Sequence, residues 1–492
     1  MPAITIHNAY LILRDIQNGE PWERLKELDD RTAYLQEGYQ FADAYAAGNW
    51  DGRVHLLRHS KKENCWKIPT GMLSVVQSMF PTATYTDLRR TPDAKRLKTE
   101  WIFPHEMIEY QKEAVEAVMA QIRNGVAPRG LLVLPIRAGK TLVAARIFHE
   151  TGLKTMFVVP SDLLLRQTKN AFREYLSAPG DWIGTIGAGE FDPQWFTVAT
   201  IQTLIQDPDS ATRLMGEYDL VILDEAHHAG KAEIWRRPIL DCDAWGKIGL
   251  TATYFDNPNV PSESAAIWVR AALGPILKKV SIRQVIDAGR LIPPDIFIYP
   301  MRMYNAPQRG HYASIYEKFI VKNEERNQTI AELARDAVGH GKRVLIDTGR
   351  LDQMHALHDL LIAEGIKVQR LHGKTSGMIR EHVLAGFKTG AIQVVVGTIL
   401  GEGVDIPELE CVINAEGGKS KTQVMQRLRN LTMHESKASA IVIDFYDIGQ
   451  KHLENHSASR LAEYDKTDGF QVHRVEQLHR PASIPWDKVS VR

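Results

Sequence analysis

The sequence predicts an α/β protein with two tandem parallel-sheet domains, preceded by a small α+β domain. Short apolar runs that end in small or turn residues recur from residue 130 onward, among them "GLLVLP", "TMFVVP" and "YDLVILDE". Stretches with helical periodicity separate them, and this alternation indicates a parallel sheet covered on both faces. A second set of runs includes "RVLIDT", "QVVVGT" and "AIVIDF". The Pro293-Pro294 pair marks an extended connection near the break between the two sets.

This pattern divides the 492-residue chain into three domains and a tail. We expect a small N-terminal domain over 1–95, a first α/β domain over 100–278 and a second over 280–450. The charged stretch "TPDAKRLKTE" at 91–100 is a predicted linker. A helical C-terminal tail is expected over 451–492. A chain of this length has room for roughly three domains of about 150 residues each.

The overall composition is that of a soluble globular protein, with 44% hydrophobic and 24% charged residues. The three cysteines, Cys65, Cys242 and Cys411, lie far apart, so no disulfide framework follows and a reducing compartment is expected. No apolar run reaches the ~18 residues of a membrane span, and the N-terminus lacks the pattern of a signal peptide. We therefore expect no membrane partner and a cytoplasmic location.

Charge is balanced overall but not locally. Lys and Arg together number 60, as do Asp and Glu, yet residues 1–50 hold 4 basic and 8 acidic residues while residues 51–100 hold 10 and 5. The net charges of these segments are therefore −4 and +5. A basic segment in a neutral protein suits a local anionic partner such as a nucleic-acid backbone. A solvated surface without a partner is the other interpretation.

A candidate phosphate-binding loop lies between the predicted strand "LLVLP" and the predicted helix "LVAARIF". In this order, backbone N–H groups and the helix N-terminus face the phosphates. Ala138 and Gly139 would line the phosphates, Lys140 would reach the β and γ phosphates, and the Thr141 hydroxyl would bind Mg²⁺. The position three residues before Lys140 is commonly glycine or another small residue, but here it is Arg137. Nucleotide binding tolerates that side chain unless the turn requires a positive φ.

Two carboxylates end the apolar strand "YDLVIL". Asp224 and Glu225 therefore lie at the carboxyl edge of a parallel sheet, where ligands bind in such folds. Asp224 can hold Mg²⁺ through water, and Glu225 can orient or deprotonate an attacking water. An Asp-Glu pair alone is usually a solvated strand end, but an upstream Gly-Lys-Thr in the same domain makes a hydrolytic site the better interpretation.

Together these motifs resemble those of superfamily 2 helicases. The resemblance rests on "GKT", "DEAH" (224–227), "TAT" (251–253) and "YQ" (110–111) in the first α/β domain. In the second domain, "VVVGTILGEGVDIPELE" (394–410) is similar to the family's fifth motif and "TQVMQRLRN" (422–430) to its sixth. The match covers about residues 100–450, and the ordered set is far more specific than any single motif.

The resemblance implies two RecA-like domains that hydrolyse ATP with Mg²⁺ in the cleft between them. Tyr110 and Gln111 would recognise adenine, and Gly403 and Asp405 would complete the nucleotide site. His227 would couple the ATP site to the second domain. Ser161, Arg166, Thr200, Gln202 and Thr398 would contact the nucleic-acid backbone.

The sixth motif departs from the family pattern. The usual Gln-Arg-x-Gly-Arg is Gln426-Arg427-Leu428-Arg429-Asn430 here. Arg427 is retained, and Arg429 is a candidate charge-stabilising finger one residue out of register. Loss of an arginine finger lowers the rate of hydrolysis by about 10³–10⁵-fold, so a slow or degenerate ATPase is an alternative interpretation.

The N-terminal segment indicates one particular type within the superfamily. "YQFADAYAAGNWDGRVHLL" followed by "PTGML" resembles the small leading domain of the phage UvsW type, whose members rewind, reverse or migrate branched DNA. Trp50 and Trp66 can stack on bases or anchor the core of a small domain. Candidate contacts to DNA phosphates in this DNA-binding domain are Arg53, Arg58, Lys61 and Lys62.

The leading hypothesis is an ATP-dependent DNA helicase or translocase that acts on branched DNA by fork reversal, branch migration, unwinding or rewinding. Its expected partners are forks, four-way junctions and single-stranded DNA. We expect a monomer, in the bacterial host cytoplasm if the protein is encoded by a phage. The alternatives are an RNA-directed or restriction-type superfamily 2 motor, and a branched-DNA binding protein with a degenerate ATPase.

Overall fold

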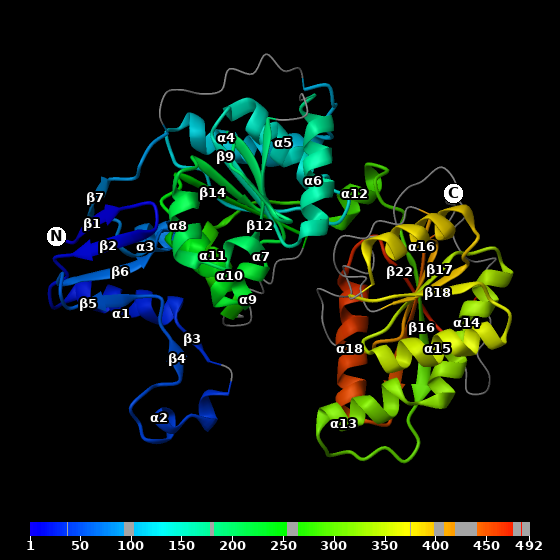
Figure 1. The fold of residues 1–492 in the computed structure, drawn as a ribbon. Helices are drawn as coiled ribbons and strands as arrows, with labels where there is room; N and C mark the ends of the chain where they lie inside the picture. The colour runs from blue at the N-terminus through cyan, green and yellow to red at the C-terminus, as the bar shows by residue number, and fades with distance from the viewer. Residues whose placement is uncertain are drawn as a thin grey trace. The chain divides into compact units, whose positions relative to one another are not determined.

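The structure is a computed structural model that describes residues 1–36, 38–92, 103–177, 182–252, 264–373, 375–397, 408–418, 440–475 and 484. The chain divides into two compact units, Met1–Val280 and Ser281–Arg492. The described residues form a five-stranded, an eight-stranded and a two-stranded sheet in the first unit and a seven-stranded sheet in the second (Figure 1). None of the helices in the described ranges is long and apolar enough to cross a membrane.

The larger sheet of the first unit confirms the predicted parallel architecture. Its strand order is β11-β10-β12-β9-β13-β14-β8-β15, and every neighbouring pair is parallel except β10 and β11. The central strands are buried along their whole length, because helices cover both faces of the sheet. The strands are β8 (Arg129–Val133), β9 (Thr155–Val159), β10 (Ile183–Gly187), β11 (Glu190–Asp192), β12 (Phe196–Thr200), β13 (Leu220–Leu223), β14 (Gly246–Thr251) and β15 (Ile276–Lys279).

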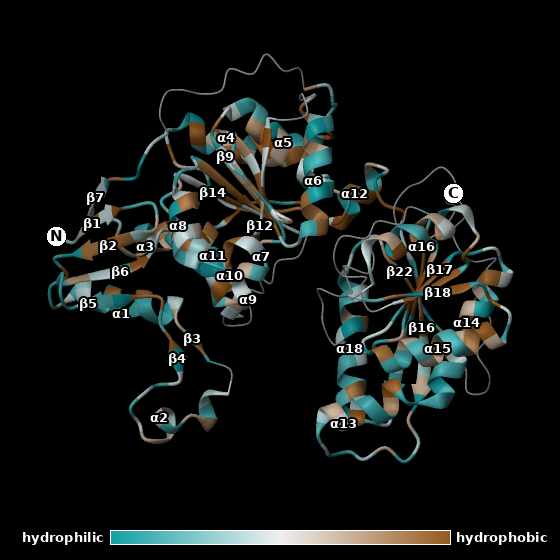
Figure 2. Cartoon of the chain, in the orientation of Figure 1, coloured by the Kyte–Doolittle hydropathy of each residue, from teal (hydrophilic) through white to brown (hydrophobic). Residues whose placement is uncertain are grey.

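Helices connect these strands as the sequence pattern predicts. Figure 2 shows mostly hydrophobic strands, and helices along which hydrophobic and hydrophilic residues alternate. The helices are α4 (Glu109–Arg123), α5 (Lys140–Thr151), α6 (Asp162–Tyr175), α7 (Ile201–Leu204), α8 (Pro208–Gly216), α9 (His228–Lys231), α10 (Glu233–Asp241) and α11 (Ser264–Leu273).

The N-terminal region forms a separate five-stranded mixed sheet of order β5-β6-β2-β1-β7. Its strands are β1 (Ala3–Ile6), β2 (Tyr10–Arg14), β5 (Arg58–Ser60), β6 (Cys65–Pro69) and β7 (Thr84–Asp87). Helices α1 (Glu20–Thr32) and α3 (Leu73–Met79) contact each other beside it. Between α1 and β5 lie the short strands β3 (Tyr34–Leu35) and β4 (Arg53–Val54) and helix α2 (Asp43–Ala46). This mixture of elements matches the predicted α+β domain.

Buried polar contacts join this small sheet to the large one. Asn8 Nδ2 donates to the backbone and side-chain oxygens of Asp243, each at 3.0 Å, and Tyr10 Oη donates to Asp241 Oδ1 at 2.7 Å. Arg129, the first residue of β8, donates from Nη2 to the Asn8 carbonyl at 2.5 Å. One hydrophobic core cluster contains residues of both sheets. The N-terminal domain is therefore packed onto the amino ends of the β8 and β14 strands.

The second unit begins at a helix cap. Ser281 Oγ accepts from the Gln284 amide at 3.2 Å, and Gln284 Oε1 accepts from the Ser281 amide at 2.9 Å, which fixes the start of α12 (Ile282–Asp287). The sheet of this unit has the order β18-β19-β17-β20-β21-β16-β22, and all its neighbouring strands are parallel. Its strands are β16 (Asp295–Arg302), β17 (Val344–Asp347), β18 (Val368–Leu371), β19 (Val394–Gly397), β20 (Cys411–Asn414), β21 (Ile441–Ile448) and β22 (Gln471–Arg474).

The segment expected as a helical tail belongs to this second sheet. Helix α18 (Lys451–Lys466) packs on β21, and β22 pairs with β16 as an edge strand. The apolar residues Leu453 and Tyr464 of α18 are buried against the sheet. The other helices of the unit are α13 (Tyr312–Tyr316), α14 (Glu324–Gly339), α15 (Leu351–Ala363) and α16 (Gly377–Thr389).

Candidate active site

The candidate phosphate loop lies at the carboxyl end of β8. Strand β8 is buried throughout, and α5 begins at Lys140 directly after the loop. Gly139 precedes the helix with φ 85° and ψ 41°, a left-handed conformation that glycine adopts without steric cost. The loop therefore directs the N-terminus of a 12-residue helix toward the sheet edge, as a phosphate site requires.

Arg137 also has a positive φ, of 63°. For a residue with a Cβ this conformation costs about 1–2 kcal/mol. The turn thus requires the conformation that glycine provides most cheaply, and this chain forms it with arginine. The loop keeps its shape, but at the cost of local backbone strain.

The Gln111 side chain is hydrogen-bonded to the backbone of the loop. This buried side chain donates from Nε2 to the Ala138 carbonyl at 2.8 Å and accepts from the Ile108 amide at 3.0 Å. Its neighbour Tyr110 is buried in α4 as well. The structure therefore places the Tyr-Gln pair beside the phosphate loop. Recognition of adenine by this pair stays a prediction.

The phosphate loop meets the carboxylate strand end directly. Lys140 Nζ lies 3.0 Å from Glu225 Oε1, which joins α5 to the residues that follow β13. Glu225 is buried and has φ 47°, and its amide donates to Asp224 Oδ1 at 2.9 Å. Asp224 is half-buried, as is Thr141. The predicted catalytic residues of the first α/β domain therefore lie at one edge of one sheet.

His227 lies between this pair and the neighbouring strand. Its Nδ1 is 3.3 Å from Thr251 Oγ1 and 3.6 Å from Glu225 Oε2. Thr251 ends β14 and begins the "TAT" motif, and both side chains are buried. One histidine ring therefore connects Glu225 to the end of β14.

The predicted nucleic-acid contacts of the first domain lie at the same edge. Ser161 follows β9 and is the N-cap residue of α6, while Thr200 ends β12. Strands β9 and β12 are parallel neighbours, with Thr200 opposite Val159. Arg166 and Gln202 are exposed, whereas the Thr200 hydroxyl donates to Thr203 Oγ1 at 2.9 Å.

The basic side chains of the N-terminal domain lie on its surface. Arg58, Lys61 and Lys62 are exposed on the β5–β6 hairpin. Arg53 pairs with Asp30 at 3.0 Å in a largely exposed ion pair. Such a pair contributes at most about 1 kcal/mol and leaves the guanidinium accessible to a stronger anion.

The two tryptophans of this domain have structural contacts. Trp66 lies 6.0 Å from Trp22 between ring centroids and packs against the hydrophobic core. Trp50 Nε1 donates to the Arg53 carbonyl at 2.7 Å. Both contacts agree with a role as packing anchors, and both rings are only partly buried.

The predicted residues of the fifth and sixth motifs lie outside the described residues. These are Thr398, Gly403, Asp405, Arg427 and Arg429. Their roles in nucleotide binding, DNA contact and catalysis stay predictions.

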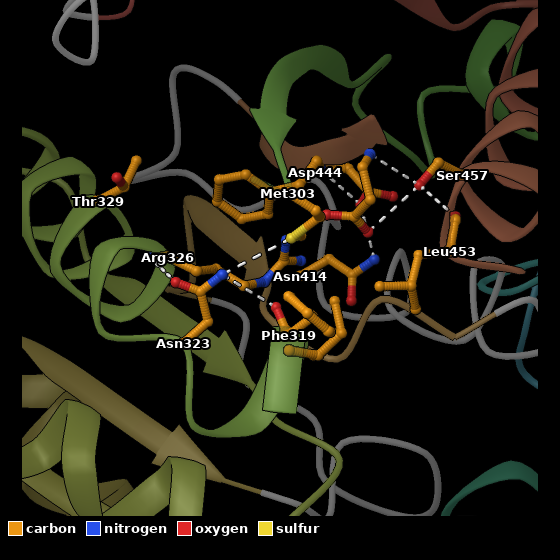
Figure 3. A network of polar contacts seen from close by, with 12 residues as sticks. Met303, Phe319, Asn323, Arg326, Thr329, Asn414, Asp444, Leu453 and Ser457 are labelled. Atoms are coloured by element: carbon orange, nitrogen blue, oxygen red, sulfur yellow. Dashed lines mark hydrogen bonds and ion pairs between the residues drawn. The ribbon is translucent and has the colours of Figure 1, made fainter. Parts of the chain in front are cut away.

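A buried ion-pair network lies in the second unit and was not anticipated from the sequence (Figure 3). Arg326 of α14 pairs with Asp447, and Arg460 of α18 pairs with Asp444 at 3.0 Å. Asp444 Oδ1 also accepts from Asn414 Nδ2 at 2.9 Å. Two aspartates three residues apart in an apolar strand were the available signal, because charges buried in a sheet require partners.

This network fixes the carboxyl end of β20. Asn414 is the last residue of that strand, and Arg460 Nη1 donates to the Gly418 carbonyl at 2.7 Å. Asp447 is fully buried, and burial raises the pKa of its carboxyl although Arg326 and Arg460 oppose this. The network therefore fixes the carboxyl ends of β20 and β21 relative to α14 and α18.

Two parallel sheets, a phosphate loop and an Asp-Glu strand end define the class of protein, an ATP-hydrolysing motor with tandem RecA-like domains. Two family models agree: "Type III restriction enzyme, res subunit" matches residues 104–256, and "Helicase conserved C-terminal domain" matches residues 325–429. The chain is a superfamily 2 helicase.

The chain is similar to the ATP-dependent DNA helicase uvsW of Enterobacteria phage T4, with 24% identity over 94% of each chain. It is also similar to the DNA 3′-5′ translocase XPB2 of Sulfurisphaera tokodaii, with 25% identity over 68% of this chain and 81% of the relative. Among solved structures, an HsdR fragment of a type I restriction enzyme from Vibrio vulnificus has a TM-score of 0.57 at 17% identity, covering 90% of this chain and 84% of that one. This structural likeness concerns the fold alone.

Proposed function

We propose that this chain is an ATP-dependent DNA helicase or translocase that remodels branched DNA, including forks and four-way junctions. The observation that carries the proposal is the 3.0 Å contact between Lys140 and Glu225. It joins the predicted phosphate loop to the predicted hydrolytic carboxylate, at the sheet edge where Ser161 follows β9 and Thr200 ends β12.

The residues of the first unit fit ATP and Mg²⁺. Bound Mg²⁺ would neutralise charge that develops on the phosphates during hydrolysis. Thr141 and Asp224 would hold the ion, and Lys140 would bind the phosphates. Because phosphate competes with Glu225 for the Lys140 ammonium, nucleotide binding would leave the Glu225 carboxylate available to orient the attacking water. Tyr110, Gln111, Ala138 and Gly139 would complete the pocket. Gly403 and Asp405 would contribute from the second domain.

Charge-stabilising arginines belong to the second domain in this proposal. Arg427 and Arg429 are the candidates, and the substitution pattern of the sixth motif makes their individual roles a question for kinetics. Loss of a true finger lowers kcat far more than nucleotide affinity.

DNA is the proposed nucleic acid for two reasons: the two relatives are a DNA helicase and a DNA translocase, and the N-terminal domain carries a local cluster of positive charge. Arg58, Lys61 and Lys62 form an exposed basic hairpin in a chain of zero net charge. Branched DNA is the proposed substrate because this hairpin belongs to a domain packed onto the motor by buried contacts. The domain can therefore grip a duplex arm while the first RecA-like domain, through Ser161, Arg166, Thr200 and Gln202, and the second, through Thr398, track one strand.

We further propose a monomer that acts in the cytoplasm of a bacterial host. The three cysteines are buried free thiols, which agrees with a reducing compartment. The similarity to a phage T4 protein over nearly the whole chain supports a phage origin.

A labelled four-way junction tests the proposed function. Wild-type protein with ATP and Mg²⁺ should convert the junction to its migrated products, and Lys140→Ala should not. Conversion without ATP, or equal conversion by Lys140→Ala, would contradict the proposal.

Salt dependence of fork binding tests the basic hairpin. Neutralising Arg58, Lys61 and Lys62 together should reduce the slope of log affinity against log salt by about 0.9 for each DNA phosphate that the hairpin no longer neutralises. Lys67→Gln is the matched control, because Lys67 is already neutralised by Glu63 at 2.8 Å. An unchanged slope in the triple variant would remove the hairpin from the DNA interface.

A further inference from the structure

A narrow arm extends from the N-terminal sheet between α1 and β5. We define the arm as residues 34–36 and 38–54. Its two ends pair as β3 and β4, with Tyr34 opposite Val54 and Leu35 opposite Arg53. Figure 1 shows these strands leading away from the five-stranded sheet to helix α2. The arm therefore presents its far end to solvent.

Aromatic contacts give the arm a defined shape. The rings of Tyr39 and Tyr45 pack edge to face, with centroids 4.8 Å apart. The Tyr39 ring lies so close to Gly52 that a Cβ there would meet Cδ2 at 2.5 Å. Trp50 Nε1 donates to the Arg53 carbonyl at 2.7 Å. Phe41 differs from these rings, because it is 84% exposed.

The base of the arm is fixed to the first RecA-like domain. Trp268 Nε1 of α11 donates to Tyr34 Oη at 2.7 Å, and the Arg236 guanidinium lies 3.9 Å from the centroid of the Trp268 ring. His55, directly after the arm, lies 2.8 Å from Asp29 Oδ2 and 3.1 Å from Asp51 Oδ2. A force on the arm is thus resisted by α1, α10 and α11.

The far end of the arm lacks the positive charge that would bind DNA phosphates. No Lys or Arg occurs between Arg31 and Arg53, whereas Asp43 and Asp51 lie on the arm. Exposed cations of the domain lie elsewhere, among them Arg58, Lys61 and Lys62 on the β5–β6 hairpin and Lys26 and Arg31 on α1. Since carboxylates repel phosphates and Arg53 lies at the base of the arm, the far end of the arm offers DNA an aromatic face without a cation. Aromatic faces stack on bases of any sequence, and apolar wedges open base steps.

We propose that this arm is a strand-separating wedge, with Phe41 stacking on the base pair at the branch point. This inference rests on the proposed function and adds the element that opens the duplex. The β5–β6 hairpin holds the duplex arm by its phosphates, the motor pulls one strand, and Phe41 covers the face of the last pair. Asp43, two residues from Phe41, keeps the phosphates of the departing strands away from the tip.

Fork unwinding by full-length variants tests the wedge. Phe41→Ala should lower the rate of unwinding of a forked duplex by about fivefold or more, because one base stack is removed. Its ATP hydrolysis with single-stranded DNA should stay within about twofold of wild type, since the ATP site is untouched. Phe41→Trp should restore unwinding, because it keeps a flat ring. Leu88→Ala, which removes another exposed apolar side chain of the same domain, should unwind like wild type.

A fluorescent base analogue at the branch point supplies a second readout. Binding of the wild-type protein to the fork should change the fluorescence emission of the base analogue, and binding of Phe41→Ala should not. Normal unwinding by purified Phe41→Ala would overturn the wedge and assign the arm to a protein partner. Equal losses in Phe41→Ala and Leu88→Ala would overturn it too. Absence of DNA-stimulated hydrolysis in wild type would instead contradict the proposed function, so the two failures are distinguishable.

Discussion

The two edges of the first large sheet use polar residues in opposite ways. At the carboxyl edge, Arg137 and Glu225 both have left-handed backbone conformations, and Lys140 and Glu225 hold one another where phosphate is expected. At the amino edge, Arg129 and Lys247 lie opposite each other on β8 and β14 and are both buried. Their charges are directed at backbone carbonyls, including that of Asn8 in the N-terminal domain. One edge holds strained groups that a ligand can rearrange, and the other holds the N-terminal domain in place.

The comparison predicts that substitutions at the carboxyl edge abolish chemistry and spare the fold. Lys140→Ala should lower steady-state ATP hydrolysis with saturating DNA by at least about 10²–10³-fold, because the cation at the phosphates is removed. Glu225→Gln should lower turnover similarly but retain ATP, since it keeps the size of the side chain and removes the group that orients water. Circular dichroism and nucleotide binding check both variants. Normal turnover in Lys140→Ala would remove the loop from the ATP site.

Substitution at the amino edge should lower the stability of the fold and leave the groups of the ATP site in place. Arg129→Ala removes donors to the carbonyls of Asn8 and Ala272 from a fully buried position. We expect the free energy of unfolding to fall by about 2–4 kcal/mol, as for loss of buried hydrogen bonds to a charged group. Urea denaturation is the measurement, with Arg123→Ala as control because Arg123 forms an exposed ion pair with Glu116. A loss in the control as large as in Arg129→Ala would show that docking is not specific.

The buried Lys247 at the amino edge should make the free energy of unfolding depend on pH. Burial lowers the pKa of this lysine to about 8, and its Nζ donates to the Leu240 carbonyl at 2.9 Å. Between this value and the ordinary pKa of about 10.5, the unfolded chain binds more protons than the folded chain, so stability should rise with pH across that window. Lys247→Met should remove the slope and raise stability near pH 7 by about 1 kcal/mol. Parallel slopes for both proteins from pH 8 to 10 would contradict the assignment.

The smallest effect is expected at Arg137. Arg137→Gly should relieve the left-handed strain, partly offset by the greater freedom of glycine in the unfolded chain, for a net gain of about 0.5–1 kcal/mol. ATP affinity should change by less than about tenfold. Arg137→Ala is the control, because it removes the guanidinium but keeps the Cβ. If alanine and glycine behave alike, the side chain matters and the backbone conformation does not.

Much of this arrangement could be predicted from the sequence. Buried parallel strands are continuous apolar runs, so the two parallel sheets and the alternation of strands and helices along the chain followed from local pattern. The Gly-Lys-Thr motif follows one predicted strand and its loop, and the Asp-Glu motif ends another, which placed both motifs after strands of the same domain. The conformation of Arg137 could not be read in this way, because a positive φ at a residue with a Cβ is imposed by the surrounding turn.

Long-range polar pairing lay beyond sequence reasoning. Asn8 and Asp243 are 235 positions apart, and no local pattern signals their contact. The same holds for Arg326 with Asp447 and for Trp268 with Tyr34. Residues 451–492 were expected as a helical tail, whereas pairing of β22 with β16 makes Gln471–Arg474 part of the sheet.

The most direct test of the central claim is steady-state ATP hydrolysis by the wild-type chain with no nucleic acid, with forked DNA and with structured RNA of equal length. A DNA-directed motor should be stimulated by at least about tenfold by the fork and much less by RNA, since hydrolysis in such a motor is coupled to its own nucleic-acid substrate. Equal or greater stimulation by RNA would make it an RNA-directed motor. No hydrolysis under any of the three conditions, with fork binding intact, would make it a branched-DNA binding protein whose ATPase has decayed.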